Sequence, residues 1–289
     1  MRGRAQRRPP GVGGRAALRA VVAAIYVFLF LPIVAVVLLS FSENISVIDF
    51  GHFTLRWYEH LMRNAPVLAA LRFSIVLGIL ASAMAVLLGS LAAFGLVRGR
   101  MRGKAALQAA LYAPIVVPEI IISVALLILF VLLRIPRGTL ALVIGHSVLI
   151  LPYVFSIVSA RLYGFDRSLE DAAANLGATP MQTLREITLP LMLPAIVGAA
   201  LIAFKVSFDE VVGSMFWSTA REQPMPVLVF SMLQFELTPE VNAIGTVMLA
   251  VTFSVLGVYQ LIEWRRRAGL EAPRGRSGSA DRSGYRRTD

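Results

Sequence analysis

Long uncharged stretches recur along this chain, and they restrict its fold more than any other feature of the sequence. Six of them are long enough to cross about 30 Å of hydrocarbon as a helix that rises about 1.5 Å per residue. A segment in lipid must satisfy its own backbone hydrogen bonds, which an α-helix does. The sequence therefore predicts an all-α, polytopic transmembrane helix bundle with six spans: Ala20–Leu39, Phe73–Val97, Ala105–Leu133, Gly138–Ala160, Pro194 to about Trp217, and Val241–Ile262.

Composition also favours a membrane over water. Hydrophobic residues make up 57% of the 289 residues and charged residues only 16%, with a mean hydropathy of +0.73. A soluble globule needs a more polar surface than this composition supplies. The first span is too long for the apolar core of a signal peptide, and no small-residue cleavage site follows it. We therefore expect it to remain as an anchor helix.

Basic residues are concentrated in alternate connecting segments. With the N-terminus inside the cell, 21 of the 28 Lys and Arg residues fall in the two tails and the two inner loops. The outer segments hold five: Arg56, Arg63, Arg134, Arg137 and Arg221. Cytoplasmic segments carry such an excess, so we expect both termini in the cytoplasm. The same bias accounts for the net charge of +11 without a nucleic-acid partner.

The predicted spans divide the chain into five parts. These are a basic cytoplasmic tail (1–19), an anchor helix (20–40), an extracytoplasmic segment (41–71), a transmembrane domain (72–263) and a second basic tail (264–289). The second tail is rich in Gly, Ser and Arg, a composition typical of disorder. The chain has no cysteine, and its three histidines lack metal-ligand spacing, so we expect neither disulfides nor a metal site.

The inner loop of residues 161–193 has helix signals of its own. Ser168 is placed to cap a short helix that ends at Gly177, and Thr179 with Gln182 has the pattern of a capping box for a second helix. Pro190 is expected to end that second helix. Reversing the chain direction requires far fewer residues, so the 161–193 loop either docks on a protein partner or lies on lipid as an amphipathic hairpin.

One pattern in this loop resembles a known motif. The segment Asp171-Ala-Ala-x-x-x-Gly177, followed after nine residues by Ile187-Thr-Leu-Pro190, resembles the EAA motif of binding-protein-dependent ABC importer permeases. The resemblance implies a coupling helix that docks on a cytoplasmic ATPase. Asp171 stands where the family usually has Glu, and Glu170 precedes it, so both acids are candidates for that contact. The implied coupling residues are Glu170, Asp171, Ala172, Ala173, Gly177, Ile187, Leu189 and Pro190.

Five further segments are similar to the spermidine/putrescine class of these permeases, in particular its second permease subunit: Phe53–Tyr58, Pro118–Ser123, Ser159–Asp166, Ser207–Val212 and Pro239–Ala243. The resemblance implies the type I ABC importer permease fold in the plasma (inner) membrane of a prokaryote. It implies polyamine import with an ATPase dimer that binds ATP and Mg²⁺, a second homologous permease subunit and an extracytoplasmic solute-binding protein.

The chain contains no phosphate-binding loop of the form Gly-x-x-x-x-Gly-Lys-Ser/Thr, so we expect a transport subunit that is no enzyme and binds no cofactor itself. Other readings stay open: a permease of the same family for a different small solute, or a secondary transporter, which would be expected to show repeat symmetry. An intramembrane enzyme would need a paired catalytic set, which the sequence lacks.

Charged residues within the predicted spans are candidates for a solute path. At helical pitch, Glu119 and Asp209 each rise about 21 to 23 Å from the inner surface, so they reach similar depths. Intramembrane carboxylates usually face a bundle interior or an aqueous cavity, where they would attract a polycation. The candidate path residues are Glu119, Asp209, Glu210 and Trp217, with Phe208 and Tyr153 as further cation-π partners. Alternatively, Asp209 or Glu210 pairs with Lys205 on the same helix. His146 is expected to serve in helix packing.

Overall fold

The computed structural model describes residues 12–44, 51–99, 101–235 and 239–271 of the chain, so the outer parts of both predicted tails lie outside the described residues. All regular secondary structure within these ranges is helical, with a single isolated bridge between Ser42 and Phe53. The long helices are α1 (Val12–Leu39), α3 (Ala65–Arg98), α6 (Thr139–Tyr163), α9 (Leu189–Phe208) and α12 (Pro239–Glu271). The predicted all-α membrane bundle is confirmed.

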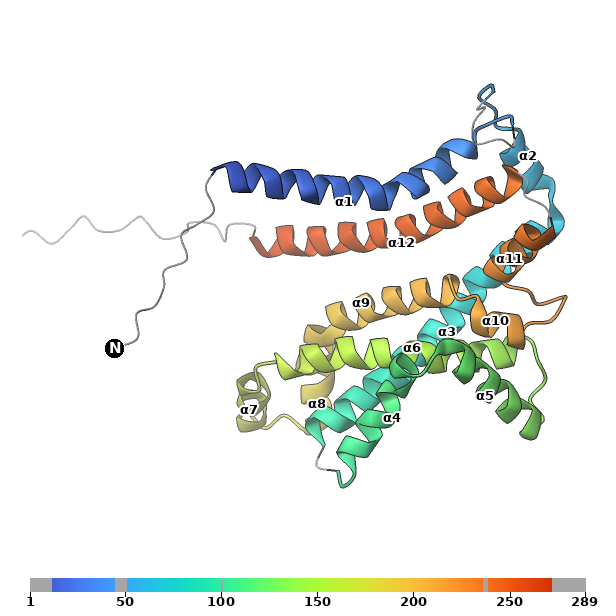
Figure 1. Ribbon diagram of the computed structural model, residues 1–289. Coiled ribbons are helices and arrows are strands. Elements are labelled where there is room, and N and C mark those ends of the chain that lie inside the picture. Colours follow the sequence, from blue (N-terminus) through green and yellow to red (C-terminus); the bar gives the residue numbers. More distant parts are fainter. Residues whose placement is uncertain (1–11, 45–50, 100, 236–238, 272–289) are drawn as a thin grey trace, which may run out of the picture.

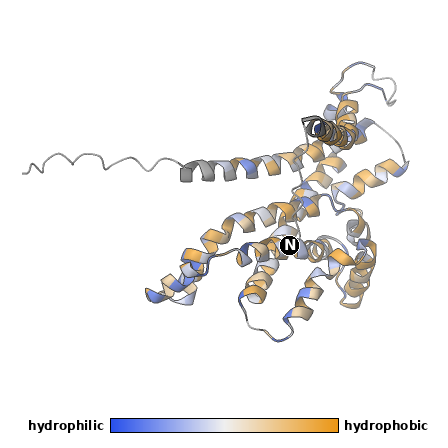
Figure 2. Cartoon of the chain, turned by 60° about the vertical axis from the view of Figure 1, so that its left-hand side comes forward, coloured by the Kyte–Doolittle hydropathy of each residue, from blue (hydrophilic) through white to orange (hydrophobic). Residues whose placement is uncertain are grey.

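Shorter helices lie between and beside these. They are α2 (Arg56–Arg63), α4 (Lys104–Val116), α5 (Glu119–Leu132), α7 (Ser168–Asn175), α8 (Pro180–Thr183), the π-turn η1 (Leu184–Thr188), α10 (Val212–Trp217) and α11 (Met225–Phe235). Five helical segments are long and apolar enough to cross a membrane, and α4 with α5 makes a sixth span if the two are taken together. Figure 2 shows hydrophobic residues along the lengths of these helices.

The predicted third span is not one straight helix. The axes of α4 and α5 differ by 113° at a break between Val116 and Glu119. Pro118 has no amide hydrogen and disfavours a helical conformation for the residue before it, and Val117 is accordingly extended at φ −79° and ψ 133°. Glu119 therefore begins a new helix. The depth predicted for it from a straight helix that starts at Ala105 does not apply.

The predicted fifth span differs from the structure at both ends. α8, η1 and α9 form one continuous helical segment, so Pro190 does not end a helix as expected. Pro190 falls within the first two positions of α9, just after the π-turn in which the Leu189 amide bonds to the Leu184 carbonyl, and proline is tolerated in a first helical turn. At the other end, α9 stops at Phe208, and α10 is a separate six-residue helix.

The core of the bundle is formed by α3, α6 and α9, which pack directly on one another (Figure 1). Fully buried alanines line the contact, namely Ala81, Ala85 and Ala93 of α3 with Ala199 and Ala203 of α9. Small residues let membrane helices approach closely. By contrast, α1 packs along α12 at the side of the molecule, and its apolar residues are exposed, for example Phe28 at 76%. An apolar helix exposed in this way is suited to lipid.

Gly145 and Gly213 form a slot for Trp217, the largest fully buried side chain among the described residues. Trp217 is completely buried, and a Cβ added at Gly145 would lie 2.3 Å from its ring. We expect Gly145→Ala to displace this indole and to lower stability by about 1–3 kcal/mol, as overpacked core sites do. Thermal unfolding of the detergent-solubilised protein measures this change. Gly95→Ala is the matched control, because an added Cβ at Gly95 meets nothing within 4 Å. Equal stability of the two variants would contradict the packing role of the slot.

Candidate functional site

The 161–193 loop folds as two short helices around a glycine turn. After α7, Gly177 adopts a left-handed conformation with φ +88°, as the sequence predicts. The predicted capping box at α8 is also present, because the Gln182 amide donates to Thr179 Oγ1 at 3.3 Å and the Thr179 amide donates to Gln182 Oε1 at 2.8 Å. The loop is thus an ordered element with a fixed turn.

The start of the first loop helix differs from the prediction. Ser168 is the first residue of α7 rather than its cap, and its amide donates to the Asp166 carboxylate at 2.9 Å. This backbone hydrogen bond, with a second from the Ser168 hydroxyl, holds the pKa of Asp166 below its usual value. Asp166 therefore satisfies the amide that begins the helix, two residues earlier than the sequence pattern indicated.

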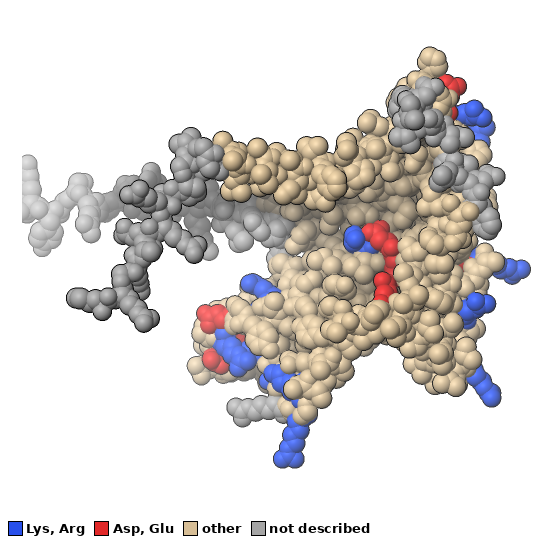
Figure 3. Space-filling model, viewed as in Figure 1, with Lys and Arg blue, Asp and Glu red and all other residues tan. Residues whose placement is uncertain are grey.

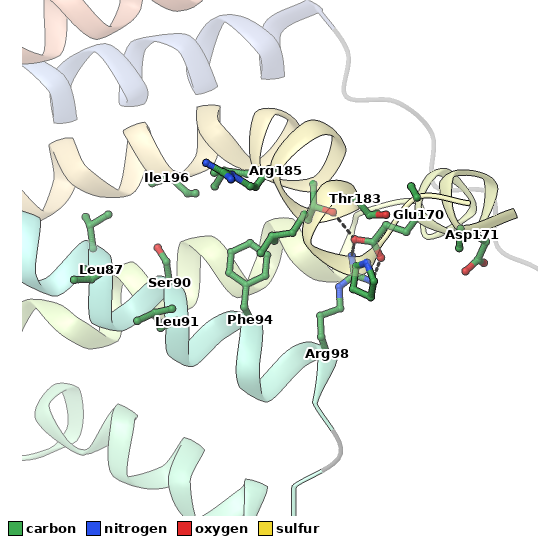
Figure 4. Close-up of a pocket in the computed structure, with 17 residues that line it drawn as sticks. Leu87, Ser90, Leu91, Phe94, Arg98, Glu170, Asp171, Thr183, Arg185 and Ile196 are labelled. Atoms are coloured by element: carbon green, nitrogen blue, oxygen red, sulfur yellow. Dashed lines mark hydrogen bonds and ion pairs between the residues drawn. The ribbon is translucent and has the colours of Figure 1, made fainter. Parts of the chain in front are cut away.

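The two candidate acids of the motif point in different directions (Figure 4). Glu170 is turned into the protein, where both of its carboxylate oxygens meet the Arg98 guanidinium at 2.9 and 3.0 Å. Thr188 Oγ1 also donates to Glu170, at 2.7 Å. Asp171 is exposed and points away from this pair. The acid that remains open to a partner is therefore Asp171.

The remaining motif residues are mostly accessible. Ala172, Gly177 and Pro190 are exposed, and Leu189 is 42% exposed, whereas Ala173 is buried and Ile187 is half-buried. The side chain of Leu176, beside the glycine turn, is 89% exposed. Together with exposed Met181 and Leu189, it gives the loop several open apolar side chains, which suit contact with a protein or with lipid.

A cavity of about 830 Å³ separates α3 from the loop and from the base of α9 (Figure 4). Its wall is mostly apolar, with Leu87, Leu91 and Phe94 from α3 facing Ile196 of α9. The hydroxyl of Ser90, also on this wall, has no hydrogen-bond partner among the described residues. Beside this cavity α3 does not pack tightly against the loop, whereas Leu96 and Val97 at the end of α3 share a buried apolar cluster with Phe165.

Within the membrane-spanning part, Lys205 and Asp209 form an ion pair. The Lys205 ammonium lies 3.1 Å from the Asp209 carboxylate, and their side chains are 51% and 38% exposed. Figure 3 shows acidic and basic side chains meeting in the hollow between the α1–α12 pair and the rest of the bundle. Glu119 is also exposed. Charges exposed within a span do not suit a lipid contact.

Glu210 and Trp217, the other two candidate path residues, are buried. Glu210 accepts hydrogen bonds from the amides of Gly213 and Ser214 at 2.7 and 2.9 Å, and it also accepts the Ser214 hydroxyl proton. The Trp217 indole donates to the Ser123 carbonyl at 3.0 Å. In this conformation both residues are shielded from solvent and hydrogen-bonded within the protein. Phe208 is buried as well, whereas Tyr153 is 41% exposed.

His146 joins this buried network. Its Nε2 lies 2.9 Å from the Ser214 hydroxyl, and its Nδ1 lies 2.8 Å from the Ser207 hydroxyl. Because Ser214 gives its proton to Glu210, Nε2 of His146 is the donor to Ser214, and Nδ1 accepts from Ser207. The histidine is thus buried with both ring nitrogens hydrogen-bonded, which agrees with the predicted packing role.

Two important contacts were not predicted from the sequence. One is the pairing of Glu170 with Arg98, which are 72 residues apart. The other is Glu222, which accepts hydrogen bonds from the Thr139 amide and hydroxyl and so caps α6 from the loop between α10 and α11. Sequence signals for helix caps are local, so neither partner was visible.

Comparison with known proteins agrees with this geometry. Residues 85–268 match the family model described as "Binding-protein-dependent transport system inner membrane component". The matched segment includes the whole 161–193 loop and all the helices from α4 to α11. The chain belongs to this family. The predicted resemblance to binding-protein-dependent permeases is therefore confirmed, and the chain is a multi-pass membrane protein.

Two curated relatives from this family align along most of the chain. The spermidine/putrescine transport system permease protein PotC of Haemophilus influenzae is 36% identical over 238 residues, which cover 82% of this chain and 93% of that protein. The putrescine transport system permease protein PotI of Escherichia coli is 34% identical over 256 residues, covering 86% and 90%.

A solved structure supports the fold. A chain of a bacterial alginate ABC transporter, determined in complex with an alginate pentasaccharide-bound periplasmic protein, superposes with a TM-score of 0.67. The match covers 87% of this chain and 93% of that chain at 15% identity. At this identity the likeness concerns the fold alone, which is that of permeases in the family.

Proposed function

We propose that this chain is a membrane-spanning subunit of an ABC importer that carries polyamines of the putrescine and spermidine type into the cell. The observation that supports this most strongly is the 36% identity to a spermidine/putrescine permease along 82% of the chain. The importer draws its energy from a separate cytoplasmic ATPase that binds ATP and Mg²⁺, since this chain has no phosphate-binding loop.

The 161–193 loop is the site where the ATPase docks. Exposed Asp171, Ala172 and Leu176 beside the Gly177 turn supply a small, partly apolar surface for a groove on the ATPase. Glu170 is already engaged by Arg98, so Asp171 is the acid that meets the partner. Docking here requires the loop and both termini to lie in the cytoplasm, which reporter fusions at Met1 and Asp289 test.

A second, homologous permease subunit covers the face that carries Lys205 and Asp209. These side chains are exposed within the membrane-spanning part of an isolated chain, and charges there require a protein or water neighbour. The solute path runs along this face, where Asp209 and Glu119 attract the cation, while Glu210 and Trp217 shape the wall from behind. An extracytoplasmic binding protein delivers the solute to the outer end.

The proposed function is tested by expressing the chain with its partner permease and ATPase in a bacterial host that lacks polyamine uptake. We expect the ATPase to co-purify with this chain and labelled putrescine or spermidine to enter the cells. Co-purification without polyamine uptake would assign the importer to a different solute. Absence of any bound ATPase would contradict the ABC importer assignment itself.

Gly177→Val should weaken coupling to the ATPase. A branched residue at φ +88° costs about 1–2 kcal/mol, which corresponds to about a 5- to 30-fold change in the population of the turn. ATPase co-purification and solute-stimulated hydrolysis should fall, whereas Gly177→Asn, which tolerates the left-handed region, should retain both. Gly103→Val is the matched control, with φ +80° and open space in the other inner loop. If Gly177→Val behaves as Gly103→Val does, the loop is not the docking element.

A double variant distinguishes two roles for Asp209, attraction of the solute and pairing with Lys205. Asp209→Asn leaves the Lys205 ammonium without its partner at 3.1 Å, so membrane abundance should decrease. Changing Lys205→Met in the same chain removes the unpaired charge and should restore abundance. If Asp209 attracts the solute, polyamine uptake per molecule of importer stays low in the double variant. Full recovery of uptake would leave Asp209 with a pairing role only.

A further inference from the structure

Arg98 and Glu170 make a contact whose geometry is more specific than that of an ordinary surface ion pair. The two guanidinium nitrogens lie 2.9 and 3.0 Å from the two carboxylate oxygens, so the contact is bidentate. Both side chains are shielded, with exposures of 21% and 24%. Paired planar groups of this kind fix orientation as well as distance, and lysine cannot reproduce them.

Two further contacts hold the pair in place. Thr188, at the end of the π-turn η1, donates its hydroxyl proton to Glu170 at 2.7 Å. The Arg98 guanidinium also lies over the Phe165 ring, 5.2 Å from its centroid. Glu170 therefore joins three elements: the cytoplasmic end of α3, the first loop helix α7 and the base of α9. We call Arg98, Glu170 and Thr188 the Arg98 clamp.

The clamp connects parts that the chain itself leaves unconnected. The 161–193 loop continues directly from α6 and into α9, but α3 is joined in sequence only to α2 and α4. Leu96 and Val97 at the end of α3 belong to the same buried apolar cluster as Phe165, but the cavity of about 830 Å³ lies between the more central part of α3 and the loop, and Arg98 and Glu170 lie in its wall (Figure 4). The clamp thus bridges α3 and α7 across the end of a void.

We infer that the Arg98 clamp is the mechanical link by which movement of the 161–193 loop reaches α3. This inference rests on the proposed docking of an ATPase on that loop. When the ATPase displaces α7, Glu170 pulls on Arg98 and on Thr188 together, so α3 and α9 shift as one body. Arg98 and Glu170 are positioning residues in this scheme, since neither touches the solute or the ATPase. In this scheme Asp171 contacts the ATPase, and Glu170 transmits the movement of the loop to α3.

The inference is tested by the stoichiometry of the complete importer reconstituted in vesicles, measured as solute transported per ATP hydrolysed. Arg98→Ala should still co-purify with the ATPase and hydrolyse ATP, but the solute transported per ATP should fall by about fivefold or more. The exchange of charges, Arg98→Glu with Glu170→Arg, should recover part of the coupling. Arg102→Ala, at an exposed position in the same inner segment, is the matched control and should leave the ratio unchanged.

A chemical bridge provides a readout that a merely structural role would not change. The natural chain contains no cysteine, so Arg98→Cys with Glu170→Cys introduces the only thiols in this subunit. Joining them with a bifunctional thiol reagent of matching length should restore solute transported per ATP, whereas modification with a monofunctional reagent should not. The double cysteine variant also tests the inference if Arg98→Ala fails to accumulate in the membrane.

Three outcomes would overturn the inference. They are an unchanged transport ratio in Arg98→Ala, loss of ATPase binding in the same variant, and failure of the bridge to restore coupling in a complex that still binds the ATPase. Absence of an ATPase on the unmodified chain is a different result, because it would contradict the proposed function rather than the role of the clamp.

Discussion

Every backbone amide and carbonyl within a bilayer needs a partner inside the protein, and the rest of this structure depends on how that requirement is met where helices break. The chain breaks at Val117–Pro118 and again after Phe208. At the second break, the Glu210 carboxylate accepts the Gly213 and Ser214 amides. The side chain thus supplies the acceptors that a continuous helix would have provided through its own carbonyls.

The two broken spans also stabilise each other. α5, which follows the first break, packs against α10, which follows the second. Trp217 of α10 donates to the Ser123 carbonyl of α5, and its ring fills the slot formed by Gly145 and Gly213. His146 of α6 completes the arrangement by bonding Ser207 on one side of the second break and Ser214 on the other. A group of broken helices is therefore fixed onto α6, while the cavity beside α3 lies toward the other end of the bundle, next to the 161–193 loop (Figure 1).

Most features that depend on neighbouring residues could be predicted from the sequence, apart from the cap at Ser168 and the helix end at Pro190, whereas those that depend on distant residues could not. The left-handed Gly177 and the capping box at Thr179 follow from the preferences of a few adjacent residues. Pro118 signals a weakness in the third span, but the direction of the turn is set by the packing of α5 on α10. The sequence predicts Trp217 to line the solute path. The slot that holds its ring is formed in part by Gly145, 72 positions earlier, and nothing near Trp217 in the sequence indicates that slot.

Distant residues also determine the different roles of the two adjacent acids, Glu170 and Asp171. In the sequence, Glu170 and Asp171 are adjacent and of equal charge, so neither is favoured as the acid that binds the ATPase. Successive residues on a helix point about 100° apart, so only one of them can face the protein interior while the other faces outward. Arg98 and Thr188 determine which one does, because they place two donors on the inner side of α7. A carboxylate that is bidentately bound and shielded would have to lose those bonds before it could bind a partner, whereas Asp171 is free to bind at once. In the proposed importer, the acid at the family's motif position stays open to the ATPase because the residue before it holds the loop to α3.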